Sequence, residues 1–310
     1  MRIDYPDPAD EPDAPRSAAR YSPPDVPRAR VVPLPPSDPV EREAVHRDYR
    51  ARVERADAAA AAPDTWSQAA PGFRARWRDH VARYPDQDQP APRNHPDGSW
   101  SCGDTRKLTP DQNAEVKHGH ARIREIGERD IVPGMLAVEA ADPSRRLAGF
   151  EHHIKGEDRL KEKIADLLGS PSNVTTSRAI AAVSDVVRFT YIYPETSYTD
   201  GVHSDVERLK GQGFELSKLK NSWSSDQYKG VNGQWREPAS GVRFEVQFHT
   251  QASHEAKELS HKAYERLRGD YAQDDEREEL EAFQSRVNAK VPVPPDVSTI
   301  EDFPREKRDG

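Results

Sequence analysis

The sequence predicts an α+β protein in which a mixed or antiparallel sheet of about five strands is flanked by helices. In the second half of the chain, runs of β-branched and aromatic residues alternate with segments whose apolar residues recur at helical spacing. The order is several helices, then strand, helix, three strands and helix. This order is typical of an α+β fold and not of a repeated parallel βαβ array.

The first hundred residues have a different composition. Eleven prolines lie within residues 1–40, with few large apolar residues, so this stretch cannot bury enough surface to offset chain entropy and is predicted to be disordered. Residues 40–62 resemble a short polar helix, and residues 63–99 a linker, a weak helical module or a partner-binding segment. We expect a Pro-rich leader over 1–105, a folded domain over 106–272, and a helical extension with an extended tail over 273–310.

Local signals place the elements of the folded part. Thr109 is a good helix cap and Pro110 a good first helical residue, while Gly169 and Pro171 end a later helix. Residues 183–193 are rich in β-branched and aromatic residues, which predicts a central strand. The predicted helices are 109–127, 133–141, 156–168, 198–210 and one after residue 250; the predicted strands are 183–193, 214–223, 227–235 and 242–250.

The last predicted strand has one apolar and one polar face. Apolar residues alternate with polar ones at a period of two, as expected when one face of a strand is buried. The other face then serves chemistry or solvent. The apolar set is Val242, Phe244, Val246 and Phe248, and the polar set is Arg243, Glu245, Gln247 and His249.

The helix after this strand carries an extra polar stripe. A solvated helix needs only an apolar and a charged zone, so a third stripe beside the apolar one favours the edge of a cleft. A solvated sheet face followed by an ordinary amphipathic helix is the alternative. The stripe consists of Ser253, Lys257, His261, Tyr264 and Arg268.

Composition excludes several classes of protein. The formal net charge is −8, and residues 151–270 hold 17 Lys plus Arg against 18 Asp plus Glu, which argues against a nonspecific nucleic-acid binder. The single cysteine, Cys102, allows no internal disulfide. No apolar run is long enough to span a membrane, and the amino terminus lacks the regions of a signal peptide. We expect a cytoplasmic protein without a membrane partner.

Carboxylates and basic groups in the folded part predict phosphate chemistry. Asp185 and Glu245 each lie on a predicted strand, and a carboxylate pair joined by Mg²⁺ would relieve the cost of burying them. By strand parity Asp185 and Arg188 face opposite sides, so a bulge or a place at the strand's end is needed to bring both to one ligand. The basic groups of this candidate phosphate site are Lys155, Lys163, Arg188 and Lys257.

These residues form an ordered series that resembles the synthetase domain of RelA/SpoT-type alarmone synthetases, in particular its small toxin-like members. The matching positions are Lys155 and Lys163, then Asp185, then Lys220, Asn221 and Trp223, then residues 226–230, then Glu245, Gln247, His249 and Thr250. Three positions depart from the family pattern. His153 and His249 stand where the family has arginine, and Asn232 stands where it has histidine.

The resemblance implies roles for individual residues. Asp185 and Glu245 would hold Mg²⁺, and Glu245 would also activate the attacking hydroxyl. Tyr228 would stack on the acceptor base. Lys155, Lys163 and Arg188 would bind the phosphates of ATP, with Lys220, Lys229, Gln247, His249, Lys257 and His261 as further substrate contacts.

The implied activity is transfer of pyrophosphate from ATP to the ribose 3′-hydroxyl of a purine nucleotide. No His-Asp dipeptide is present, so the family's companion hydrolase domain is not expected. An unbalanced synthetase would act as a toxin or effector, with an antitoxin or immunity protein as partner. Two alternatives stay open: the 3′ end of tRNA as the acceptor, and an inactive synthetase-like module that binds a nucleotide or a partner protein.

Overall fold

The computed structural model describes residues 65–84, 91–170, 174–268 and 274–304. The chain divides into two compact units, Met1–Pro33 and Leu34–Gly310, and every described residue belongs to the second. The disorder predicted over residues 1–40 and the helix predicted over 40–62 lie outside the described residues.

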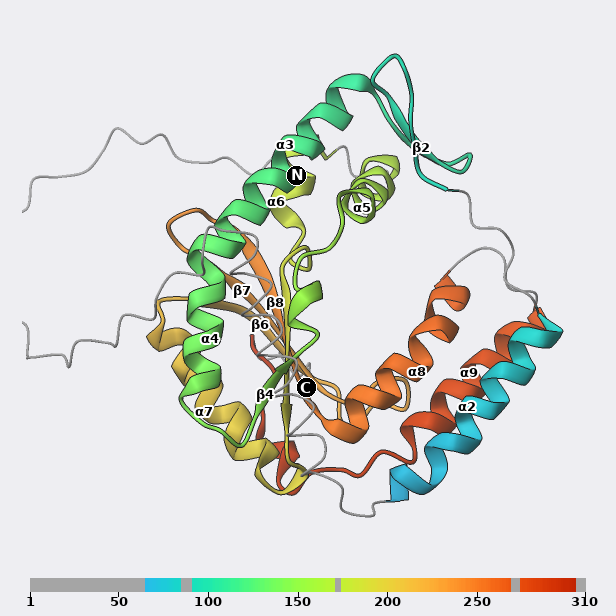
Figure 1. The fold of residues 1–310 in the computed structure, drawn as a ribbon, viewed down its shortest axis with the longest axis vertical. Helices are drawn as coiled ribbons and strands as arrows, with labels where there is room; N and C mark the ends of the chain where they lie inside the picture. Colours follow the sequence, from blue (N-terminus) through green and yellow to red (C-terminus); the bar gives the residue numbers. More distant parts are fainter. Residues whose placement is uncertain (1–64, 85–90, 171–173, 269–273, 305–310) are drawn as a thin grey trace, which may run out of the picture. The chain divides into compact units, whose positions relative to one another are not determined.

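Helix α2 (Thr65–Arg83) packs on the carboxyl-terminal helices α8 (Gln251–Arg268) and α9 (Asp274–Asn288) (Figure 1). It contains Pro71, yet Trp66 and Phe73 are buried. The indole of Trp66 donates a hydrogen bond to Glu255 of α8 at 2.9 Å. Of the alternatives for residues 63–99, a helical module therefore describes this part.

A small antiparallel sheet, which the sequence did not predict, follows α2. Its strands are β1 (Arg93–Asn94), β2 (Trp100–Cys102) and β3 (Arg106–Leu108). The buried Trp100 indole donates to Asp158 of helix α5 (Glu157–Gly169) at 3.0 Å, so the sheet is attached to the folded part. The boundary expected at residue 105 falls between β2 and β3.

The long helix α3 (Pro110–Ile126) begins where the sequence predicts. The Thr109 hydroxyl accepts a hydrogen bond from the Gln112 backbone, and the Gln112 side chain accepts one from Thr109 N–H, which completes a capping box. The chain continues through a π-helical turn (Gly127–Ile131) into α4 (Val132–Ala140). No loop separates the two predicted helices.

The main sheet has five strands in the order β4-β5-β8-β7-β6, which confirms the predicted α+β class. The strands are β4 (Arg146–Ala148), β5 (Arg188–Tyr193), β6 (Glu215–Asn221), β7 (Val231–Arg236) and β8 (Arg243–Thr250). Only β5 and β8 pair in parallel, so the sheet is mixed.

Strand β5 starts at Arg188 and not at residue 183, so the predicted boundary was wrong. Residues Thr176–Ala182 form helix α6, because Thr175 caps an alanine-rich segment of good helix formers. Asp185 consequently lies in the connection between α6 and β5. The parity conflict with Arg188 disappears, since Asp185 is not part of the strand.

Strand β7 likewise begins later than predicted. Residues 227–230 form a loop, in which the Gln227 backbone donates to the Ser225 hydroxyl at 3.1 Å. The Lys229 amine donates to the carbonyl of Trp223 at 2.8 Å, across the same turn. Tyr228 is therefore presented from the loop before β7 and not from a strand.

One face of the sheet packs against α4 and α7 (Tyr198–Gly211), on the side opposite α8 (Figure 1). The Tyr191 hydroxyl donates to the carbonyl of Met135 on α4, and that of Tyr198 on α7 donates to the carbonyl of Phe248, each at 2.7 Å. Phe244 and Phe248 are fully buried, as the alternating pattern predicts. This face holds the core, which leaves the other face for the polar residues.

The described part of the tail is extended and returns to the sheet. A short 3-10 turn (Val297–Thr299) leads to Phe303, which pairs with Leu219 on the edge strand β6. Val297 and Ile300 are buried. Among the described residues, no helix is both long and apolar enough to cross a membrane.

Candidate active site

The strand register brings the predicted polar residues onto one face of the sheet. Arg188 of β5 lies opposite Glu245 of β8, and Thr190 lies opposite Gln247. Residues two apart on a strand point to the same side, so both pairs share the face that α8 covers. A cation and a carboxylate are thus placed next to each other at the start of two parallel strands.

Glu245 is held by its neighbours on the strand. The Gln247 amide donates to Glu245 Oε1 at 2.5 Å, and the Glu245 backbone N–H donates to the Val187 carbonyl at 3.0 Å. Gln247 is 5% exposed, and its Oε1 has no hydrogen-bond partner among the described residues. A buried acceptor of this kind is costly unless a donor reaches it, which favours a ligand with hydroxyl or amine groups here.

Lys257 on α8 lies close enough to Arg188 and Glu245 to feel the charge of both. Burial lowers the pKa of its amine, and the charge of Arg188 adds to the effect, against the weaker pull of Glu258 and Glu245. Burial and the charge of Lys257 also lower the pKa of His254 to about 4. The Arg188 side chain has no ion pair with the described residues. Lys257 lies 3.4 Å from a Glu258 carboxylate oxygen, so the charge left without an ion pair is that of Arg188, which suits a phosphate.

Two lysines meet the Asp185 carboxylate at the border of this face. Lys155 Nζ donates to Oδ2 at 2.6 Å and Lys163 Nζ to Oδ1 at 2.5 Å. Burial alone would raise the pKa of Asp185, but the hydrogen bonds and charges of the lysines outweigh it and lower the pKa to about 2. The carboxylate is ionised at neutral pH and fixes both amines.

We expect Asp185→Asn to lower the free energy of unfolding by about 1 to 2 kcal/mol at pH 7, allowing for solvent screening of the part-exposed lysines. Because the folded-state pKa is lowered, the carboxylate's contribution is complete above about pH 4 and is lost as the pH falls toward 2. Chemical denaturation from pH 7 to pH 3 measures this difference. Asp166→Asn, which breaks the exposed pair with Arg106, should cost less than about 1 kcal/mol. A difference for Asp185→Asn that stays constant down to pH 3 would contradict the lowered pKa.

Tyr228 and His249 form a hydrogen-bonded unit at the carboxyl end of β8. The Tyr228 hydroxyl lies 2.8 Å from both Asn232 Oδ1 and His249 Nε2, and His249 Nδ1 lies 2.8 Å from the Ser253 hydroxyl. Since Tyr228 gives its proton to Asn232, Nε2 donates to Tyr228 and Nδ1 accepts from Ser253. Burial, reinforced by the charge of Lys257, keeps the pKa of His249 well below its usual value. A neutral imidazole therefore fixes the tyrosine.

Gly230 leaves the space that His249 needs. A Cβ at this position would lie 2.8 Å from His249 Cε1 and 3.2 Å from the Phe248 carbonyl. We expect Gly230→Ala to lower the free energy of unfolding by about 1 to 3 kcal/mol through overpacking, as measured by chemical denaturation. Gly211→Ala is the control, because nothing lies within 4 Å of a Cβ there. Equal stability of the two variants would contradict the close contact.

Other predicted site residues lie elsewhere. The Lys220 amine donates to Asp302 of the tail at 2.7 Å, and Lys229 is bound to the Trp223 carbonyl. The His261 side chain is 47% exposed, one turn beyond Lys257, and pairs at 3.8 Å with Glu265. The polar stripe of α8 thus faces the sheet at its start and solvent further along.

Arg146 on β4 was not among the residues predicted from the sequence. Its guanidinium donates to Gln251 Oε1 at 2.7 Å and contributes to lowering the pKa of His254. The antiparallel pairing of β4 with β5 places Arg146 opposite Ile192. No local motif marks it, because a three-residue edge strand carries almost no sequence signal.

The carboxylates present fit Mg²⁺ only together with a substrate. Within the described residues no group of three or more His, Cys, Asp or Glu side chains forms a metal site. Mg²⁺ commonly binds one or two carboxylates plus nucleotide phosphates and water. Asp185 and Glu245 are the carboxylates that would take part, and Asp185 would have to release a lysine amine, because Lys155 and Lys163 occupy both of its oxygens.

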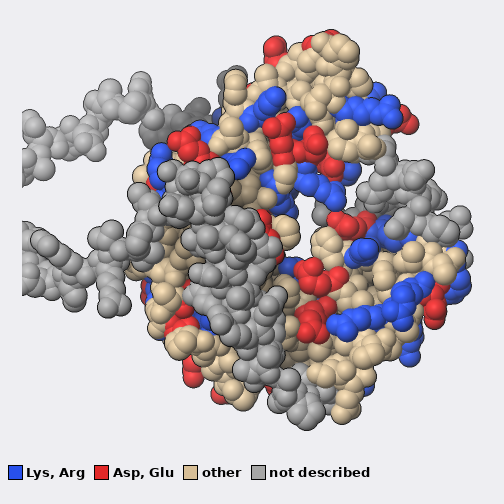
Figure 2. Space-filling view, in the orientation of Figure 1, with Lys and Arg blue, Asp and Glu red and all other residues tan. Residues whose placement is uncertain are grey.

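The candidate active site is the set of residues Lys155, Lys163, Asp185, Arg188, Glu245, Gln247 and Lys257, with Tyr228 and His249 at its edge. In the space-filling view the surface is hollowed between the positions that α5 and α8 occupy in Figure 1. Acidic and basic side chains both border this hollow (Figure 2). The mixed charge around this recess agrees with the nearly balanced composition of residues 151–270.

No protein-family model and no curated protein sequence matches the chain. Similar solved structures include smu.1046c from Streptococcus mutans UA159, with 16% identity and a TM-score of 0.41 over 56% of this chain and 89% of that one. A GTP pyrophosphokinase family protein from Streptococcus pneumoniae has 15% identity and a TM-score of 0.40, covering 59% and 89%. Small alarmone synthetase 1 from Bacillus subtilis, bound to its product pppGpp, has 15% identity and a TM-score of 0.36, covering 58% and 89%. At these values the similarity assigns no activity, which has to rest on the residues.

Proposed function

We propose that this chain is an ATP- and Mg²⁺-dependent pyrophosphokinase that transfers pyrophosphate to the ribose 3′-hydroxyl of a purine nucleotide. The observation that carries the proposal is the pairing of Arg188 with Glu245 on one sheet face, beside Lys257 and Asp185 with its two lysines. The order of these residues along the chain, which resembles the alarmone synthetases, supports it.

The basic residues are suited to the phosphates of ATP. Phosphoryl transfer depends mainly on positioning and on neutralising charge at nonbridging oxygens. Lys155 and Lys163 are fixed by Asp185 and Lys257 pairs with Glu258 at 3.4 Å, while Arg188 has no ion pair among the described residues. Bound Mg²⁺ would supply further neutralisation of the same oxygens.

Glu245 is suited to the role of general base. Its carboxylate would take the proton of the 3′-hydroxyl while the ribose oxygen forms a bond to the β-phosphorus of ATP. The bond between that phosphorus and the α–β bridging oxygen breaks, and AMP leaves. Gln247 orients Glu245 through their hydrogen bond and keeps a free acceptor oxygen for a ligand donor.

Tyr228 would offer its ring to the acceptor base. A base stacked on an aromatic side chain gains about 1 to 3 kcal/mol, and stacking tolerates several bases. His249 and Asn232 fix the tyrosine, so an incoming nucleotide meets an ordered ring. The acceptor's identity then depends on polar contacts around the ring and not on the stack.

The experiment is an incubation of the full chain with ATP labelled on its γ-phosphate, Mg²⁺, and in turn ADP, ATP, GDP, GTP and bulk tRNA. Transfer of label to a nucleotide is the expected result. Transfer only to tRNA would show that the acceptor is the 3′ end of tRNA and not a free nucleotide. Label on none of the five would overturn the enzymatic proposal and favour a binding module.

A toxic role in the cytoplasm, with a neutralising antitoxin or immunity protein, extends the proposal. Production of the alarmone or depletion of ATP would arrest growth of a bacterial host that expresses the chain. Growth after induction is the measurement, with Glu245→Gln as the matched variant. Equal arrest by both proteins would separate toxicity from pyrophosphate transfer.

A further inference from the structure

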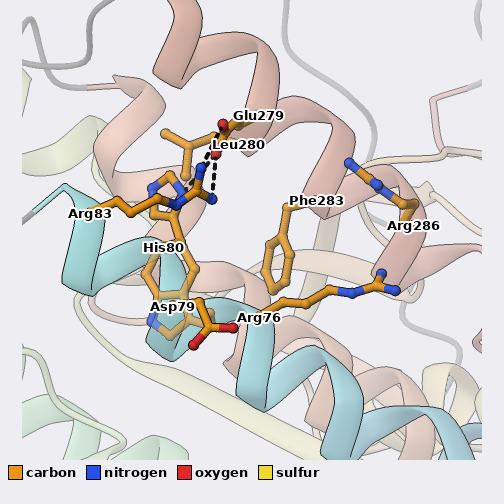
Figure 3. Close-up of a pocket in the computed structure, with 9 residues that line it drawn as sticks. Arg76, Asp79, His80, Arg83, Glu279, Leu280, Phe283 and Arg286 are labelled. Carbon is orange, nitrogen blue, oxygen red and sulfur yellow. Dashed lines mark hydrogen bonds and ion pairs between the residues drawn. The ribbon is translucent and has the colours of Figure 1, made fainter.

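A cavity of about 330 Å³ lies between α2 and α9, built from residues outside the candidate active site (Figure 3). Its α2 wall precedes the main sheet in the chain and its α9 wall follows it. The residues that line it are Arg76, Trp77, Asp79, His80, Arg83, Glu279, Leu280, Phe283 and Arg286.

Arg76 on α2 and Arg286 on α9 both line this cavity (Figure 3). Arg286 uses its Nε on the Ala282 carbonyl of its own helix at 3.0 Å, and Arg76 lies over the Phe73 ring at 5.8 Å. Neither has a carboxylate within ion-pair distance among the described residues. Two like charges that line one cavity without an anion repel each other, and this repulsion is relieved when an anion binds beside them.

Arg83, also on α2, differs from Arg76 because it has a carboxylate partner. Its guanidinium donates to both carboxylate oxygens of Glu279 at 3.1 and 3.0 Å, so its charge is matched within the protein. Glu279 therefore does not serve Arg76 or Arg286. The remaining acid of the lining is Asp79, which forms no ion pair with either arginine.

The rest of the cavity offers apolar ring surface. The Trp77 and Phe283 rings lie 5.6 Å apart with a tilt of 37°, and Trp77 also stacks on His80 at 5.3 Å. These rings are already in contact, so a ligand ring cannot enter between them. It can pack against their free surface while its charged group reaches the arginines.

We propose that this cavity binds a phosphate monoester with a small aromatic body. A phosphomonoester carries a charge of about −1.5 to −2 at neutral pH, which matches two guanidinium groups, whereas a carboxylate carries one. Guanidinium forks bind phosphate oxygens in pairs, and a volume near the lower end for ligand pockets suits a molecule of this size. The bound ligand contacts both α2 and α9.

The test is a calorimetric titration of the full chain with phenyl phosphate, repeated with Arg76→Gln and Arg286→Gln. Each substitution is expected to raise Kd about tenfold, because a charge-assisted hydrogen bond is lost. Arg78→Gln, on α2 but outside the lining, is the matched control. Asp79→Asn should lower Kd, an outcome that a folding defect cannot produce. Trp77→Phe should remove the fluorescence change that accompanies binding.

The candidate active site also attracts phosphate, so Arg188→Gln is titrated alongside. Binding that Arg188→Gln leaves intact and the two cavity variants weaken supports the proposal, whether or not the chain transfers pyrophosphate. Binding that only Arg188→Gln weakens, or a Kd that none of the cavity substitutions changes, overturns it. Benzoate that binds as tightly as phenyl phosphate would overturn the assignment to phosphate.

Discussion

Glu245→Gln is expected to lower the rate of pyrophosphate transfer by about a hundredfold to ten-thousandfold, the usual contribution of a general base. The amide keeps the shape of the side chain and its contact with Gln247 but cannot take the hydroxyl proton. Initial rates with labelled ATP and the acceptor that the proposed incubation identifies measure the effect. Because the lysines and the arginine that would bind ATP are unchanged, the loss should fall mainly on kcat.

Glu215→Gln is the matched control for this substitution. Glu215 also lies on a strand, β6, but it is exposed and paired with Arg236 at the far edge of the sheet. Its transfer rate should equal that of the unaltered chain. Full transfer by Glu245→Gln, with an unchanged unfolding transition, would remove Glu245 from the reaction.

Asp205→Asn is expected to lower the free energy of unfolding by about 3 to 5 kcal/mol, the range for breaking a buried ion pair. Asp205 on α7 pairs with Arg145, and neither side chain is exposed. The Tyr193 hydroxyl of β5 and the Arg208 guanidinium also donate to Asp205, each at 2.7 Å. Without this carboxylate, the buried Arg145 keeps only the part-exposed Asp142, at 3.1 Å, as an ion-pair partner.

Urea denaturation at pH 7 measures this loss. Glu207→Gln lies on the same helix with a largely exposed side chain, and it should change stability by less than about 0.5 kcal/mol. Because Asp205 lies on the side of the sheet away from α8, the variant should keep its transfer activity wherever it is folded. A loss of less than 1 kcal/mol would mean that the pair is solvated.

Much of the fold follows from local signals. The Thr109 and Pro110 start, the strand over residues 242–250 and its helix were predicted from capping and periodicity, and the structure confirms them. These signals act over a few residues, so they can be read from the chain alone. The small sheet β1–β3 and helix α6 were not predicted, because strands of two or three residues and a seven-residue helix carry weak periodicity.

In the candidate site, too, some features were predicted from the sequence and others came only from the structure. Residue types and their order identified Glu245, Asp185 and the basic groups, because phosphate chemistry requires carboxylates and cations. The place of Asp185 before β5, the use of both His249 nitrogens within the protein, and the entry of Arg146 were decided by strand boundaries and strand pairing. Contacts between segments far apart in sequence leave no local pattern.

The sequence by itself determined the α+β class, the polar face of β8 and the chemistry that its residues can perform. Only the tertiary structure decided which groups meet, namely Arg188 beside Glu245, two lysines on Asp185, and Lys220 on Asp302 and not on the sheet face. The reason is physical. Periodicity and capping depend on neighbours in the chain, whereas register, burial and charge pairing depend on the packing of the whole domain.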